Sequence, residues 1–124
     1  MLKTLNTKKA PQPIGPYSQG VDADGLVFLS GQIGLKPDSG DLVAGLAEQT
    51  KQIMENIGSV LESAGCSMAN VVKSTVYLRN MNDFAEFNKI YAVYFKNNPP
   101  ARTTVEVSAL PKNALIEIDI IARK

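Results

Sequence analysis

Apolar residues recur along this chain with two different periods, and these periods predict its secondary structure. Five segments predict strands: Thr103–Val107 and Leu115–Ala122 show two different sides at a period of two, Val71–Leu78 contains four β-branched residues, and the two short segments before them flank a turn. They span Gly20–Asp22, Leu26–Gly31, Val71–Leu78, Thr103–Val107 and Leu115–Ala122. Asp24-Gly25 between the first two is a strong hairpin signal. Residues 1–19 predict one more short strand and then an irregular loop, because prolines and glycines interrupt the pattern.

Two longer segments follow the helical period. Over about Ala44–Ala64 the apolar residues form one stripe, and Gly65 stands where a left-handed residue ends a helix. A second helix is expected to begin with a capping box at Asp83 and Glu86 and to end before Pro99. Its large apolar residues share one broad face, which indicates a core role and not a cofactor site. They are Phe84, Phe87, Ile90, Tyr91, Tyr94 and Phe95.

The order of these elements predicts one α+β domain over residues 1–124, with two helices covering one face of a mixed sheet of about six strands. The last strand distinguishes the two faces. Its apolar side, expected under the helices, consists of Ile116, Ile118, Ile120 and Ala122. The other side mixes Glu117 and Asp119 with Leu115 and Ile121, which suits neither a solvated face nor a plain core.

This mixed face is expected to form a subunit contact. Val71 and Tyr77 are expected on it together with Leu115 and Ile121, and apolar residues in such numbers need a covering partner. The carboxylates would then line a polar pocket inside the contact.

Composition limits the possible functions. The net charge of +1 gives no general attraction to nucleic acid or to an anionic membrane. We expect neither a membrane span nor a signal peptide, and the single cysteine fits a reducing compartment, so a cytoplasmic location is expected. The chain has no histidine, which removes Ser-His-Asp and Cys-His catalysis. It also lacks phosphate-loop and dinucleotide-binding motifs and a zinc ligand set, so no cofactor and no metal are expected.

Arg102 is the first candidate for chemistry. Two prolines, Pro99 and Pro100, precede a strand in which Arg102 and Thr104 lie on the same side. An arginine in this position can be a solvated charge. It can also be a planar fork for a carboxylate.

Six short motifs resemble, in order and spacing, those of the RidA (YjgF) family of reactive enamine/imine deaminases. They are Gly15-Pro16-Tyr17-Ser18, Leu29-Ser30-Gly31-Gln32, Pro100-Ala101-Arg102, Val105-Glu106-Val107, Leu110-Pro111-Lys112 and Ile116-Glu117-Ile118. Each motif is weak alone, but the set covers essentially the whole chain. The resemblance implies a chorismate-mutase-like fold and a homotrimer packed through the open sheet faces, with an active site at each subunit interface.

The resemblance also implies a reaction. Short 2-imino acids and their enamine tautomers, such as 2-aminoacrylate and 2-iminobutyrate, are hydrolysed to 2-keto acids and ammonia. Pyridoxal-phosphate enzymes release these compounds, which gives a functional link to such enzymes. By analogy Arg102 binds the substrate carboxylate and Glu117 activates water. Tyr17 and Asn88 shape the pocket, and Ser30-Gly31 brings backbone against the ligand.

Thr104 departs from the family pattern. Many members have a cysteine there, so a catalytic thiolate is ruled out at this position. The Thr104 hydroxyl, or a backbone N–H, can still hold the water. Cys66, the single cysteine, follows the first helix and is interpreted as a packing residue.

Two other functions remain open from the sequence. The same pocket could bind a small carboxylate without turnover, in a trimer with a role in metabolic or purine regulation. Relatives have also been described as translation inhibitors or ribonucleases. The near-neutral charge and the lack of histidine argue against nucleic acid as a partner.

Overall fold

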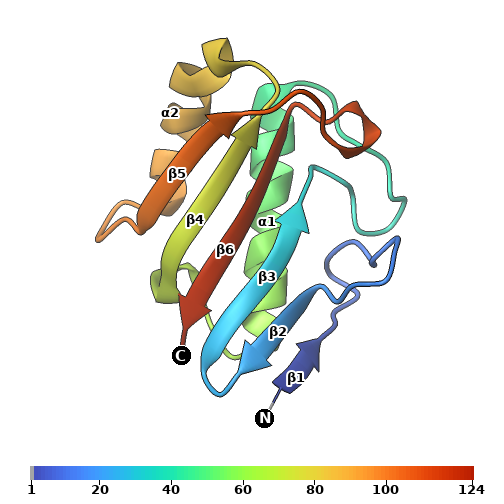
Figure 1. Ribbon diagram of the computed structural model, residues 1–124, viewed down its shortest axis with the longest axis vertical. Coiled ribbons are helices and arrows are strands. Elements are labelled where there is room, and N and C mark those ends of the chain that lie inside the picture. The colour runs from blue at the N-terminus through green and yellow to red at the C-terminus, as the bar shows by residue number, and fades with distance from the viewer. Residues whose placement is uncertain (1) are drawn as a thin grey trace.

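A computed structural model describes residues 2–124 and confirms the expected α+β arrangement. The strands are β1 (Leu2–Leu5), β2 (Gly20–Ala23), β3 (Leu26–Gln32), β4 (Val71–Leu78), β5 (Ala101–Glu106) and β6 (Ile116–Arg123). They form one sheet in the order β1-β2-β3-β6-β4-β5. The pair β4–β5 is parallel and the other pairs are antiparallel. Both helices, α1 (Leu46–Ser63) and α2 (Phe84–Tyr94), lie on one face of this sheet (Figure 1).

Two turns follow the sequence signals. Between β2 and β3, Asp24 has φ 53° and Gly25 has φ 98°, as the predicted tight hairpin requires. After α1, Gly65 has φ 78°, which confirms the predicted left-handed end of this helix. Neither helix in the described part of the chain is long and apolar enough to cross a membrane.

The start of α2 differs from the prediction. Asp83 has helical angles, φ −81° and ψ −4°, and its side chain makes no capping hydrogen bond. A short 3₁₀ turn, Met81–Asp83, precedes the helix, and the Asn80 side chain accepts a hydrogen bond from the Asn82 N–H at 2.9 Å. The predicted capping box at Asp83 and Glu86 is therefore wrong, because the chain already turns into helical geometry at Asn80.

The main core lies between the sheet and the two helices. The apolar side of β6 faces it as predicted, with exposures of 0–2% for Ile116, Ile118, Ile120 and Ala122. From α1 the core receives Ile53, Ile57, Val60 and Leu61, all fully buried. The opposite, open face of the sheet therefore carries the side chains of Glu117, Asp119 and Ile121.

Two residues expected on the open face lie elsewhere. Val71 is 6% exposed and pairs with Ala122, because an irregularity between Val71 and Lys73 shifts β4 against β6 and turns Val71 towards the helices. Leu115 precedes β6 and packs against the main core. Tyr77 does lie on the open face, opposite Glu117.

Other apolar side chains take the place of these two on the open face. Phe28 is 42% exposed and pairs with Ile121, and Val105 is 38% exposed and pairs with Tyr77. At the start of β3, Leu26 is 43% exposed. The open face thus combines exposed apolar residues with two carboxylates, which is the mixed character that the sequence predicted.

Candidate active site

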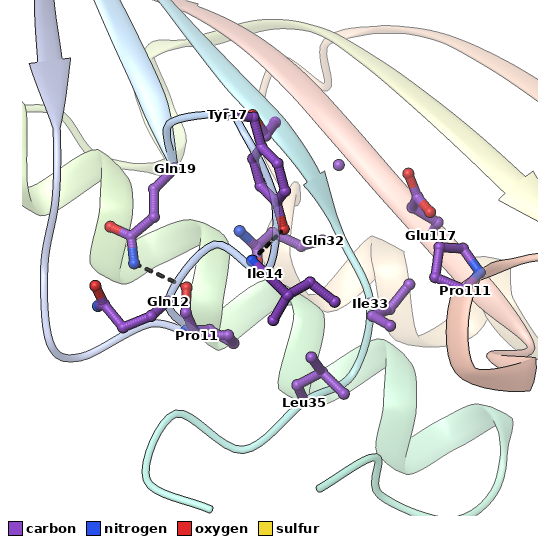
Figure 2. A pocket seen from close by; sticks show the side chains of 12 residues that line it. Pro11, Gln12, Ile14, Tyr17, Gln19, Gln32, Ile33, Leu35, Pro111 and Glu117 are labelled. Atoms are coloured by element: carbon purple, nitrogen blue, oxygen red, sulfur yellow. Dashed lines mark hydrogen bonds between the residues drawn. The ribbon is translucent and has the colours of Figure 1, made fainter. Parts of the chain in front are cut away.

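A cavity of about 400 Å³ lies between the N-terminal loop, the end of β3 and Glu117 of β6 (Figure 2). Four predicted site residues line it, namely Tyr17, Ser30, Gly31 and Glu117. Its apolar walls include Ile14, Ile33, Leu35 and Pro111. The Tyr17 ring is 49% exposed, and its hydroxyl accepts a hydrogen bond from the Ile14 N–H at 3.4 Å. The cavity can therefore accommodate a small molecule with polar and apolar parts.

Gln19 fixes the loop that forms one wall of this cavity. Its side chain is 1% exposed, accepts a hydrogen bond from the Thr7 N–H at 2.7 Å and donates to the Pro11 carbonyl at 2.9 Å. The backbone carbonyl of Gln19 accepts a hydrogen bond from the Ser30 N–H at 3.0 Å, and this bond connects the loop to β3. The Ser30 hydroxyl donates to the Ser18 carbonyl at 2.6 Å. Sequence reasoning did not select Gln19, whose only signal was an amide at the end of a proline-rich loop.

Glu117 is half-buried against the backbone of Gly31. A methyl group on Gly31 would overlap the Glu117 carboxylate, so glycine at this position allows the carboxylate to lie directly against the backbone. Burial, and then the charge of Asp119, raise the pKa of Glu117 above its ordinary value. Tyr77 donates a hydrogen bond to Asp119 Oδ2 at 3.0 Å. Burial and this hydrogen bond raise the pKa of Tyr77, which keeps it a donor at neutral pH.

Arg102 lies on the other side of the sheet. It pairs with Ser74 of β4, which is fully buried under the helices. Its Cζ atom lies 5.5, 5.2 and 4.9 Å from the ring centroids of Phe84, Phe87 and Tyr91 on α2. Within residues 2–124 no carboxylate pairs with this guanidinium and no hydrogen bond occupies it.

Thr104 and Asn88 belong to the same side as Arg102. Thr104 pairs with the fully buried Val76, and its hydroxyl oxygen is buried with no hydrogen-bond partner among the residues described. Asn88 is half-buried on α2, directly after Phe87.

The predicted site residues therefore form two groups on opposite faces of one chain. Arg102, Thr104 and Asn88 lie on the helix side, whereas Glu117 faces the open side. Ser74 and Tyr77, the β4 partners of Arg102 and Glu117, point to opposite faces. A single chain does not bring the arginine and the glutamate together.

The acidic and sulfur-containing side chains do not suggest a metal centre. Among residues 2–124, no group of three or more His, Cys, Asp or Glu residues is arranged to hold an ion. Cys66 is buried and belongs to the main core, which confirms its interpretation as a packing residue.

Comparison with known proteins places the chain in a family. It matches the family described as Endoribonuclease L-PSP over residues 7–124. A human protein named 2-iminobutanoate/2-iminopropanoate deaminase is 51% identical over 121 residues, which cover 97% of this chain and 88% of the human one. A crystal structure of a Rid family protein from Yersinia pestis is 48% identical, with a TM-score of 0.97 and 100% of both chains covered. The structure of E. coli TdcF with bound serine is 38% identical, with a TM-score of 0.95 and 98% of both chains covered. These matches confirm what the six motifs indicated, and the chain belongs to the Endoribonuclease L-PSP family, that of the RidA (YjgF) proteins.

Proposed function

We propose that this protein hydrolyses reactive 2-enamine and 2-imino acids, such as 2-aminoacrylate and 2-iminobutyrate, to 2-keto acids and ammonia. One observation carries the proposal. Arg102 is a half-buried guanidinium that pairs with no carboxylate of residues 2–124, in a chain that also holds a half-buried carboxylate in a cavity. An arginine in this state suits an anionic ligand, because its planar fork matches a carboxylate. The name of the human relative supports the choice of substrate.

The proposed site is completed by a second copy of the chain in a homotrimer. Phe28, Val105 and Ile121 give the open face its apolar character, and such a face needs a partner. The edge strand β5 carries Arg102 at one end of the sheet, whereas Glu117 lies on β6 beside β3. Contact between the open face of one subunit and the β5 edge of its neighbour would bring Arg102 to Glu117.

In the proposed mechanism the two residues act on different parts of the substrate. Arg102 holds the carboxylate and so fixes the imine carbon. Glu117 accepts a proton from water as the water oxygen bonds to this carbon. Glu117 passes this proton to the imine nitrogen, which gives a neutral carbinolamine. The hydroxyl proton of the carbinolamine then moves to the nitrogen, the C–N bond breaks as the C=O bond forms, and ammonia leaves a 2-keto acid. Tyr17, Asn88 and the Ser30-Gly31 backbone shape the space around the substrate.

A coupled assay tests this function. A pyridoxal-phosphate-dependent threonine dehydratase generates the imine from threonine, and keto acid appearance is timed with and without this protein. We expect the protein to accelerate keto acid release at catalytic concentration. The same rate with and without the protein would contradict the proposal, provided that the free imine is shown to accumulate. Positive results would also support the functional link to pyridoxal-phosphate enzymes.

A non-catalytic carboxylate-binding trimer is the second candidate. The observation that favours it is the relative TdcF, whose structure is described with bound serine, an amino acid carrying a carboxylate. In this case keto acids or amino acids would bind, and no keto acid would form in excess over protein. The coupled assay separates the two candidates.

Asp119 is expected to set the pH range of activity. Glu117 acts as a base only when ionised, so kcat/KM falls as the pH drops through its pKa, which Asp119 helps to raise. Asp119→Asn removes this charge, while its amide oxygen can still accept the Tyr77 hydrogen bond. The acid limb of the kcat/KM profile should therefore move to lower pH. Asp38→Asn changes an exposed carboxylate outside the cavity and should leave the limb in place. A limb that stays fixed in Asp119→Asn would contradict Glu117 as the base.

Thr104→Val tests whether the threonine hydroxyl holds the water. We expect turnover to fall by about tenfold or less, because a backbone N–H can still hold the water. Thermal stability should not fall, because the buried hydroxyl has no hydrogen-bond partner to lose among the described residues. Thr104→Cys should be active. Unchanged turnover in Thr104→Val would remove this hydroxyl from the mechanism.

A further inference from the structure

Three aromatic rings on α2 lie close to the arginine of the proposed site. Phe84, Phe87 and Tyr91 recur at helical spacing on one face of α2, and each ring centroid lies within 5.5 Å of the Arg102 Cζ atom. Phe87 is fully buried, Tyr91 is 6% exposed, and Phe84 is partly buried against the core. We call these three side chains the aromatic cage.

The cage is itself held rigidly. The Tyr91 and Ser74 hydroxyls share a buried hydrogen bond of 2.6 Å. Ser74 is also the strand partner of Arg102, so this bond fixes Tyr91 directly beside the arginine. Tyr91 packs between Phe87 and Phe95, with ring centroids 5.2 and 4.7 Å away. The rings therefore present fixed surfaces to the guanidinium.

A cage of this kind solves a problem that a buried arginine poses. Burying the guanidinium charge costs free energy unless another group stabilises it. A protein carboxylate would stabilise the charge, but it would also occupy the N–H groups that a ligand carboxylate needs. Aromatic rings attract the cation through their electron-rich faces and leave its N–H donors free. The absence of any ion pair to Arg102 among residues 2–124 agrees with this solution.

We propose that Phe84, Phe87 and Tyr91 are positioning residues that hold the Arg102 guanidinium ready for a ligand carboxylate. The inference rests on the proposed function, because it takes Arg102 as the carboxylate clamp. It assigns to the aromatic face of α2 a role beyond core packing. A preorganised arginine loses less freedom when the ligand binds, so the cage should act on affinity and only weakly on the chemical step.

Phe84 offers the sharpest test, because it is the least buried ring of the cage. Phe84→Leu keeps an apolar side chain and removes the ring, whereas Phe84→Tyr keeps a ring. Tyr94→Leu is the matched control, since Tyr94 is a partly buried aromatic residue on α2 whose ring makes no cation–π contact with Arg102. We expect Phe84→Leu to raise the KM, and the Kd for a 2-keto acid measured by calorimetry, by about fivefold with kcat nearly unchanged. Phe84→Tyr and Tyr94→Leu should stay close to the parental protein.

Equal effects of Phe84→Leu and Tyr94→Leu, or a loss confined to kcat, would overturn the proposal. A double-mutant cycle makes the contact measurable without any ligand. Thermal unfolding of Phe84→Leu, Arg102→Met and the double variant should show coupling between the two sites. Coupling together with unchanged keto acid affinity in Phe84→Leu would show a purely structural cage and overturn the positioning role.

The outcomes also separate this proposal from the deaminase proposal. If the parental protein binds keto acid but does not turn over imine, the deaminase proposal fails, and the Kd values of the variants still decide whether the cage positions Arg102. If it binds no keto acid at all, both proposals fail.

Discussion

Chains carrying Arg102→Lys and chains carrying Glu117→Gln are expected to be nearly inactive alone and to regain activity when they assemble together. Lysine keeps the charge of Arg102 but loses the fork, and each charged hydrogen bond lost costs roughly 1.5–3 kcal/mol. If the arginine comes from one subunit and the glutamate from its neighbour, a mixed trimer contains some sites with both native residues. In a random equal mixture about a quarter of the sites are native, so about a quarter of the parental activity should return.

The experiment co-refolds the two variants and measures imine hydrolysis in the coupled assay. Variants refolded separately and then combined serve as the control for subunit exchange, and native mass spectrometry confirms that mixed trimers are present. The reference mixture joins the parental chain with the double variant. It should retain about a quarter of the activity for a shared site, but about half for a site within one chain. Mixed trimers without regained activity would contradict the shared site. A monomeric mass in sedimentation analysis of the parental protein would contradict the trimer as well.

Period-two alternation predicted much of this site, because it fixes which residues share a side of a strand. Arg102 and Thr104 were placed together in this way, and they do lie on the same side of β5. On β6 the same rule separated Glu117 from the buried isoleucines. The motifs then gave the family, which the comparisons confirm.

The sequence could not show features that depend on register between distant strands. Val71 was expected on the open face, but an irregularity in β4 turns it into the core. The aromatic residues of α2 were interpreted as core alone. Their contact with Arg102 arises because β5 pairs in parallel with β4 and lies under α2, and no local pattern encodes that pairing. The capping box at Asp83 failed for a local reason, since Asn80 starts the turn earlier.

Glu117→Gln is expected to separate catalysis from binding. Glutamine has nearly the same size as glutamate and can still form hydrogen bonds, so it fits against Gly31, where little space is available. It cannot accept the proton of the attacking water. Turnover should therefore fall by about 10²–10⁴, the usual contribution of a positioned general base. Binding of a 2-keto acid should persist or tighten, because Arg102 is unchanged and a negative charge near the ligand is gone.

The fold should tolerate Glu117→Gln, so the parental protein and the variant can be compared in the same folded state. The raised pKa of Glu117 means that folding favours its protonated form. The resulting stabilisation is present below the pKa of the unfolded state and is lost as the pH rises through the folded pKa. Above the folded pKa the glutamate no longer provides it, so in that pH range the neutral glutamine variant should unfold at the same or a higher temperature. Calorimetry with the keto acid and the coupled assay are run on both forms after each is shown to be a trimer. In a non-catalytic binding protein only the affinity would change. Parental turnover in the glutamine variant would remove Glu117 from the mechanism and favour a water held by the backbone without a protein base.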